Sequence, residues 1–226
     1  MRRGTAVAGM ALGALLLLAP PAQAAATSPV ATWTMGEPAG SRTMVDSYGS
    51  HDGAIGSDVV LTGSAYTFPF VDARTYRPQH LVTVPDSSAL DPGTGSWAVT
   101  ARFKTGNYNS NILQKGQSSS PGGFLKMEIH QGLLSCLFRG DTGSRAVSSG
   151  RTLSDGIWHT VRCERSGTTV SMTIDGAAPR QISGATGNIS NAAPFVIGGK
   201  ASCNATTVGC DYWSGQMDDV RIQHGP

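Results

Sequence analysis

The sequence contains one short segment in which a carboxylate and an imidazole stand close together. Glu128-Ile129-His130 separates the two groups by two residues, so an extended strand would point both side chains to one face. Such a pair could transfer protons to and from a bound substrate. A glycosidase, however, needs two carboxylates, about 5–5.5 Å apart in retaining enzymes and about 6.5–9.5 Å apart in inverting ones. The segment supplies one carboxylate, so we assign no catalytic residue and expect a protein that is not an enzyme.

Aromatic side chains are the second set of candidates, because their rings can stack on sugars. Trp97 and Trp158 lie in segments with strand-like alternation, which favours core positions. Trp213, beside Tyr212, follows a loop bracketed by cysteines, so we expect these two residues to bind the ligand, with packing as the alternative. Trp33 is not assigned a role. Four tyrosines in loop-like stretches could also line a groove: Tyr48, Tyr66, Tyr76 and Tyr108.

The N-terminal residues predict export. Arg2 and Arg3 precede the apolar run Ala6–Leu18, and Ala22-Gln23-Ala24 supplies a cleavage site. The run is shorter than the roughly 20 residues that a membrane-spanning helix needs. We therefore expect a signal peptide at 1–24, a single domain at 25–226, a secreted, extracellular protein and no membrane anchor after cleavage.

The charge balance indicates the class of partner. Arg2 and Arg3 leave with the signal peptide, so 15 of the 17 basic residues remain against 15 acidic ones. Proteins that bind nucleic acid carry a basic patch or stripe, and no such run is present in the sequence. The balance argues against nucleic acid and favours an uncharged partner such as a glycan.

Four cysteines in an exported chain predict two disulfides, and three connectivities are open. Cys203 and Cys210 bracket a short loop that a bridge could clamp. Cys136 and Cys163 lie in two strand-like runs, and a bridge between them would join neighbouring strands. We favour these two pairings, with a structural role for both.

The remaining sequence predicts many short strands and no helix. Residues 96–104 alternate apolar and polar side chains, as a half-buried antiparallel strand does. Asp175-Gly176 favours a turn with positive φ. The other expected strands are 124–130, 133–139, 158–165, 169–174, 193–197 and 216–222. This pattern predicts an all-β fold, an antiparallel jelly-roll sandwich of two sheets.

In order and spacing, several segments resemble the laminin-G-like (LamG), or concanavalin-A-like lectin/glucanase, superfamily in its secreted bacterial form. The most specific segment is Leu153–Val161, which reads L-S-D-G-I-W-H-T-V and leads into a strand ending in Asp-Gly. Residues 64–79 depart from the pattern, and we expect a loop or an irregular strand there. The other resembling segments are Ala31–Glu37, Val45–Gly49, Ile112–Gly116, Pro194–Gly199 and Gly215–Ile222.

The resemblance implies a calcium site at one edge of the sandwich. Asp46 and Asp218 occupy the family's acidic positions, and the main-chain carbonyl near His51 could assist. Calcium takes six to eight oxygen ligands in flexible geometry. Because adjacent strand residues point to opposite faces, only one of Asp218 and Asp219 should face such a metal. The alternative is that these residues form turns and hydrogen bonds.

The resemblance also bears on catalysis. His159 belongs to the family's strand signature, so we interpret it as structural. Retaining enzymes of the superfamily carry E-x-D-x-x-E on one strand, and that motif is absent. Ile129-His130 resembles an element of alginate-lyase sandwiches, but it occurs in the reverse order relative to their Lys- and Tyr-bearing strand.

These observations predict a secreted, non-catalytic binding module for a carbohydrate or an extracellular surface, with calcium as a candidate cofactor. We expect a monomer. Two alternatives stay open: a polysaccharide-degrading glucanase or lyase of the same superfamily, and a protein-binding or structural domain.

Overall fold

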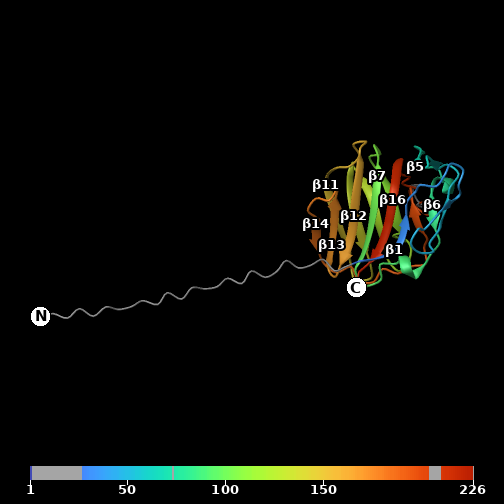
Figure 1. Cartoon of the computed structure of the whole chain (residues 1–226). Coiled ribbons are helices and arrows are strands. Elements are labelled where there is room, and N and C mark those ends of the chain that lie inside the picture. The colour runs from blue at the N-terminus through green and yellow to red at the C-terminus, as the bar shows by residue number, and fades with distance from the viewer. Residues whose placement is uncertain (2–26, 73, 204–209, 226) are drawn as a thin grey trace.

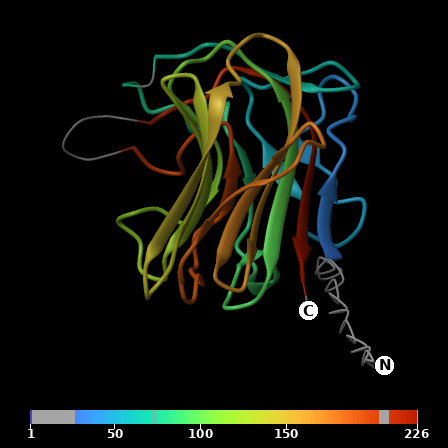
Figure 2. The ribbon, with the colours of Figure 1, turned by 90° about the vertical axis from the view of Figure 1, so that its left-hand side faces the viewer.

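Two antiparallel sheets of eight strands each lie face to face (Figures 1 and 2). The computed structural model describes residues 1, 27–72, 74–203 and 210–225. The predicted sandwich is therefore confirmed, whereas residues 2–24 of the predicted signal peptide lie outside the described residues. No helix in the described part of the chain is long and apolar enough to span a membrane.

The first sheet, sheet A, is centred on β7 and β16. Its strands in spatial order are β14 (Arg180–Ser183), β13 (Thr169–Ile174), β12 (Trp158–Ser166), β7 (Trp97–Lys104), β16 (Gly215–His224), β5 (Tyr66–Phe68) and β4 (Val60–Leu61). Strand β1 (Ser28–Trp33) also pairs with β16, beyond the three residues that pair with β5. The first and last strands described thus lie side by side (Figure 1).

The second sheet, sheet B, carries the candidate site described below. Its strands in spatial order are β11 (Ser144–Thr152), β10 (Leu133–Arg139), β9 (Phe124–His130), β8 (Ser110–Lys115), β15 (Phe195–Ile197), β6 (Val82–Val84), β3 (Gly53–Ile55) and β2 (Thr43–Met44). Two 3₁₀ turns, η1 (Pro78–His80) and η2 (Ser88–Leu90), lie in the connections. Among its described residues, the predicted irregular stretch 64–79 contains β5 and the start of η1 as its regular elements.

The hairpin turns follow the local sequence. Gln131 and Gly132 have φ values of 52° and 78° between β9 and β10, and Asp175 and Gly176 have values of 52° and 72° after β13. Positive φ at two successive residues matches the right-handed twist of paired strands. Strands β9, β10 and β13 have the predicted bounds.

The core fills the space between the sheets with side chains from both. Trp33 of sheet A stacks on Phe195 of sheet B with ring centroids 5.6 Å apart, and Trp97 meets Phe138 edge to face at 6.0 Å. Trp97 is fully buried, as predicted. The core position predicted for Trp158 is wrong, because inward-facing residues of β12 alternate from His159 onward, which leaves Trp158 half-buried on the outer face.

Both favoured disulfides are present, Cys136–Cys163 and Cys203–Cys210. Cys136 lies in β10 of sheet B and Cys163 in β12 of sheet A. The bridge therefore joins the two sheets across the core, and the prediction that it joins neighbouring strands is wrong, because β10 and β12 belong to different sheets. Both sulfurs point inward from strands that face each other, which a sequence pattern cannot distinguish from lateral pairing.

Candidate functional site

Asp46 is the hydrogen-bond acceptor that holds its own loop together. Its Oδ1 accepts from the N–H groups of Thr32 at 2.9 Å and Tyr48 at 3.0 Å. Its Oδ2 accepts from the N–H of His51 at 3.0 Å and lies 3.2 Å from the ring Nδ1 of that residue. Burial raises the pKa of Asp46, but main-chain hydrogen bonds from Thr32, Gly49, Tyr48 and His51 outweigh it and lower the pKa overall.

Asp218, the second residue predicted to bind calcium, lies in a β-bulge of β16. The register shifts between Asp218 and Val220, and Asp219 has a φ of 52°. Asp218 forms an ion pair with Arg102 at 2.7 Å, and Asp219 forms one with Arg221 at 2.6 Å. The bulge breaks the alternation on which the expected opposite orientation of the two carboxylates rests. Both are partly exposed and paired with arginine.

These residues do not fit the implied calcium site. The Asp46 carboxylate is engaged by N–H donors, the His51 carbonyl accepts from Trp33 Nε1 at 2.8 Å, and Asp218 faces a guanidinium. Calcium needs several oxygen ligands converging on one point. Within the described residues, no group of three or more His, Cys, Asp or Glu is arranged to hold a metal ion.

Tyr212 and Trp213 are not at a rim, and the prediction that they bind the ligand is wrong. Trp213 is fully buried and Tyr212 is 3% exposed. Trp213 packs against Phe68 and Phe103, with ring centroids 5.2 and 6.4 Å away. Neither ring offers a face to a sugar, because both side chains are buried in the protein, as the packing alternative predicts.

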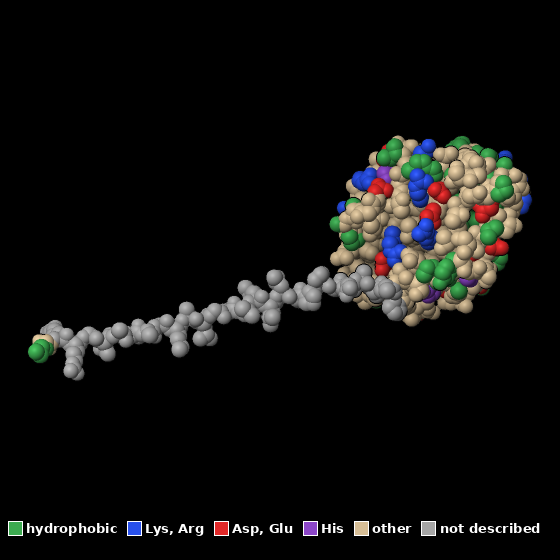
Figure 3. Space-filling model, in the orientation of Figure 1, with side chains coloured by type: hydrophobic (Ala, Val, Ile, Leu, Met, Phe, Trp, Pro, Cys, Tyr) green, Lys and Arg blue, Asp and Glu red, His purple; other side chains and the backbone are tan. Residues whose placement is uncertain are grey.

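The outer face of sheet A carries charges that neutralise one another. Figure 3 shows Lys and Arg side chains beside Asp and Glu over β7, β12 and β16. Arg162 pairs with Glu164 at 2.9 Å, alongside the two arginine–aspartate pairs of β16. The Arg102 guanidinium also lies 4.2 Å from the ring centroid of Trp158.

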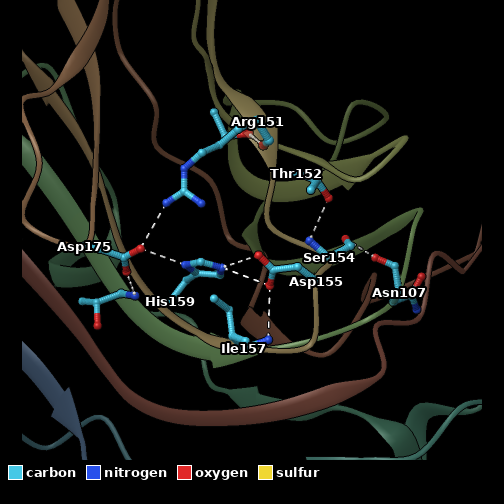
Figure 4. A network of polar contacts seen from close by, with 10 residues as sticks. Asn107, Arg151, Thr152, Ser154, Asp155, Ile157, His159 and Asp175 are labelled. Atoms are coloured by element: carbon cyan, nitrogen blue, oxygen red, sulfur yellow. Dashed lines mark hydrogen bonds and ion pairs between the residues drawn. The ribbon is translucent and has the colours of Figure 1, made fainter.

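Figure 4 shows His159 between two carboxylates at one end of sheet A. Its Nδ1 lies 2.8 Å from Asp175 Oδ2, its Nε2 lies 3.2 Å from both oxygens of Asp155, and Arg151 also contacts Asp175. Burial raises the pKa of each carboxyl group, but hydrogen bonds that include those from His159 outweigh it and lower both. His159 is 2% exposed, which agrees with the structural interpretation.

The outer face of sheet B is hollowed where β8 and β9 adjoin the segments that carry Lys200 and Asp211. Two adjoining hollows of about 90 and 170 Å³ share Asn111, and we call them together the polar groove. Residues of the smaller hollow include Asn111, Gln114, Lys126 and Lys200. Residues of the larger include Asn109, Ser110, Asn111, Glu128, His130 and Asp211.

Strand register explains why polar side chains meet in the groove. Asn111 of β8 stands opposite Glu128 of β9, and Gln114 stands opposite Lys126. The outward residues of β9 are polar because its inward residues, Leu125, Met127 and Ile129, fill the core. The Asn111 N–H donates to the Asp211 carbonyl at 2.8 Å, which holds the following segment against the edge of the groove.

One buried polar atom of β8, Gln114 Nε2, lies on the groove side and has no hydrogen-bond partner among the described residues. Gln114 is 3% exposed, and its Oε1 accepts from Asn111 Nδ2 at 2.9 Å while its Nε2 is unpartnered. Ser110 Oγ is unpartnered too, but Ser110 stands opposite the inward-facing Ile129, on the other side of the strand. Leaving a buried donor unsatisfied costs about 1–3 kcal/mol. A ligand in the groove with a hydroxyl group would supply the missing acceptor for Gln114 Nε2.

The charged side chains of the groove are paired with one another. Lys126 Nζ lies 2.5 Å from Glu128 Oε2, and Lys200 Nζ lies 2.5 Å from Asp211 Oδ2. Glu128 and His130, the acid–base pair of the sequence, thus share a hollow with a second carboxylate, Asp211. No sequence pattern points to Asn111, Gln114 and Asp211, because only the pairing of β8 with β9 and the contact of Asp211 with Asn111 bring them beside β9.

The laminin G domain family model matches residues 103–225. No curated protein sequence matches the chain. Three solved structures that resemble it have TM-scores of 0.57 to 0.61 and sequence identities of 11 to 14%, which establish a shared fold alone.

The first of these is the binding domain of Paraclostridial Mosquitocidal Protein 1, with 11% identity and a TM-score of 0.61, covering 87% of this chain and 48% of that one. The second is domain 4 of AbnA, a GH43 extracellular arabinanase from Geobacillus stearothermophilus, in complex with arabinotriose, with 14% identity, a TM-score of 0.60 and coverage of 88% and 93%. The third is the binding domain of Botulinum Neurotoxin DC in complex with SialylT, with 11% identity, a TM-score of 0.57 and coverage of 87% and 46%.

Domains LG4-5 of the mouse laminin alpha1 chain resemble this chain at 20% identity with a TM-score of 0.50, over 64% of this chain and 40% of that one. The chain thus spans about half or less of the mosquitocidal and laminin structures. Because the family match covers more than half of the 226 residues and the sandwich agrees with it, the protein belongs to the laminin G domain family.

Proposed function

We propose that the protein is an exported glycan-binding module that holds an oligosaccharide in the polar groove of sheet B. The observation that carries the proposal is the unpartnered Gln114 Nε2, buried at the groove beside the carboxamide of Asn111. Sugar hydroxyls both donate and accept hydrogen bonds, so one hydroxyl could accept from Gln114 and donate to a neighbouring oxygen.

Two further features support a glycan. The charges of the groove are paired internally, which favours an uncharged polar ligand over an ionic one. Two proteins of the same fold are complexed with arabinotriose and with SialylT, according to their descriptions. Both disulfides are consistent with an extracellular location, where such bonds persist.

The test is retention of the disulfide-bonded chain on a panel of immobilised polysaccharides, with Gln114→Leu as the variant. Gln114→Leu keeps the approximate volume and removes the donor, so we expect a loss of binding of about tenfold, the equivalent of about 1.4 kcal/mol. Gln181→Leu, on the exposed strand β14 of sheet A, is the matched control and should bind normally. Failure of the unaltered chain to bind any polysaccharide would reject the proposal and favour a protein partner.

A polysaccharide-degrading enzyme is the second candidate, because one hollow contains Glu128, His130 and Asp211. Both carboxylates are engaged in ion pairs with lysines, so neither stands free to exchange a proton with a substrate. The supernatants of the binding test should therefore contain no new reducing or unsaturated sugar ends. Product formation that His130→Ala abolishes would establish the enzyme instead.

A further inference from the structure

A third hollow opens beside the polar groove, and the described residues that line it are uncharged. Its volume is about 530 Å³, and its lining includes Phe70, Asn107, Tyr108, Asn109 and Ser214. Asn109 also lines the larger hollow of the polar groove, so the two spaces adjoin. An occupant of the groove that extended past Asn109 would enter this third hollow.

Two aromatic rings stand exposed at this hollow. The side chain of Phe70 is 81% exposed and that of Tyr108 is 59% exposed. Both rings are therefore available to a ligand, unlike the buried rings of Tyr212 and Trp213. Aromatic faces are attractive to the C–H groups on the flat side of a sugar ring, and exposing a phenylalanine to water is costly unless something covers it.

The polar lining of the hollow is held in place by the fold. Asn107 Nδ2 donates to Ser214 Oγ at 3.2 Å, and Asn107 Oδ1 accepts from the N–H of Asn109 at 3.2 Å. Asn109 Oδ1 accepts from the N–H of Gln131 at 2.9 Å, and the Tyr108 carbonyl accepts from the N–H of Gly132 at 3.0 Å. These bonds fix the loop to the β9–β10 hairpin, so little conformational entropy would be lost on binding.

We propose that this hollow is a stacking subsite for a neutral sugar ring of the glycan held in the polar groove. Phe70 and Tyr108 would cover the faces of the ring, and the carboxamides of Asn107 and Asn109 would meet its hydroxyls. None of the described residues that line the hollow is charged, so a uronate or sulfated sugar would lose water without gaining an ionic partner. The inference rests on the proposed function and specifies its ligand class as a neutral glycan.

The test measures affinity for soluble hexasaccharides of neutral polysaccharides, arabinan, xylan and β-glucan among them, and for polygalacturonate hexasaccharide as the anionic probe. We expect the chain to bind a neutral hexasaccharide and not the anionic one. Phe70→Ala and Tyr108→Ala should each weaken binding by roughly tenfold, because each removes one exposed ring face. Tyr108→Phe should retain most of the affinity. Tyr48→Ala, which removes a ring of equal exposure elsewhere, should bind as the unaltered chain does.

The outcomes separate this inference from the proposed function. If Gln114→Leu abolishes binding while Phe70→Ala and Tyr108→Ala leave it unchanged, the groove binds glycan and the stacking subsite is rejected. Equal affinity for the anionic hexasaccharide rejects the neutral ligand class. If the unaltered chain binds no saccharide at all, both proposals are rejected, and the exposed rings are better explained by contact with a protein.

Discussion

Asp46 and Gln114 are both buried polar side chains, but they differ in how far their hydrogen-bonding capacity is used. Asp46 accepts three main-chain N–H bonds and faces the His51 ring, so its carboxylate is satisfied by its own loop. Gln114 has one bond to Asn111 and an unpartnered donor. A satisfied buried group stabilises the fold, whereas an unsatisfied one at a hollow is a reason to expect a ligand.

Substitution Asp46→Asn tests the structural role of this residue. The amide would place an N–H₂ group against main-chain donors, so we expect a loss of about 2 kcal/mol in the free energy of unfolding at pH 7. Urea denaturation of the unaltered chain and of the variant measures this difference in the free energy of unfolding. Asp72→Asn is the control, because Asp72 pairs with Arg74 at the surface, where such pairs contribute little.

The pH dependence of the same variant has a defined sign. The folded-state pKa of Asp46 is lowered from 3.8, so its contribution to stability is present above that pH and is lost as the pH falls through the folded value. The difference in stability between the unaltered chain and Asp46→Asn should therefore shrink below pH 3.8. A difference that stayed constant down to pH 2 would contradict this role.

Asp175 combines a hydrogen-bonding role with a special backbone conformation. Its Oδ1 accepts from the Thr160 N–H at 2.9 Å, and its φ is 52°. Asp175→Asn keeps an acceptor and tolerates the left-handed conformation, so we expect a loss of about 1 kcal/mol. Asp175→Ala loses both and should cost about 1 kcal/mol more. Thermal unfolding of the two variants side by side measures the difference, and equal losses would show that neither the acceptor nor the conformation carries the extra cost.

At the scale of elements, hydrogen-bonded strand pairing stabilises each sheet, and a disulfide links the two sheets. Sheet A is centred on β7, which pairs with β12 and β16, and the Cys136–Cys163 bridge ties β12 to β10 of the opposite sheet. Because of the bulge at Asp219, both Asp218 and Asp219 lie on the outer face of sheet A, where each forms an ion pair with an arginine. Without that bulge, the alternation of β16 would direct one of the two carboxylates into the core.

The two disulfides should contribute unequally to stability. The bridges close segments with sequence separations of 27 and 7 residues, for which chain entropy predicts about 3.6 and 2.5 kcal/mol. The double substitution of Cys136 and Cys163 by alanine should therefore lower the denaturation midpoint more than that of Cys203 and Cys210. Equal losses would show that the inter-sheet bridge stabilises no more than the short loop does.

At the scale of the whole molecule, the two outer faces of the sandwich differ in character. Sheet A presents salt bridges across its outer face (Figure 3). Sheet B presents the polar groove, and the third hollow, lined by Phe70 and Tyr108, adjoins the groove at Asn109. An elongated space with paired charges suits a chain of sugar units better than a compact ionic ligand.

Calcium should not be needed for either stability or binding. The residues implied for a calcium site are engaged by N–H and guanidinium donors, so we expect chelator to leave the Tm and the glycan affinity unchanged. An ion bound at 100 times its Kd would add about 2.7 kcal/mol, a shift that thermal unfolding with and without calcium would detect. A calcium-dependent rise in Tm that Asp46→Asn removes would restore the calcium site.

The sequence alone determined the features that depend on neighbouring residues. Alternation predicted β9, β10 and β13 with their bounds, because a strand has a side-chain period of two. Asp175-Gly176 predicted a turn because both residues tolerate positive φ. The disulfide pairings followed from cysteine placement, and the order of weak motifs indicated the family.

The tertiary structure alone decided which side of each strand faces the core and which distant residues meet. Alternation separates two faces but does not say which is inward, so Trp158 was placed on the wrong side. The burial of Trp213 depends on Phe68 and Phe103, which lie far from it in the sequence. The polar groove needs β8 beside β9 and Asp211 against Asn111. The contacts of Asp211 with Asn111 and of Trp213 with Phe103 join segments a hundred or more residues apart, and only the packing of two sheets around one core fixes them.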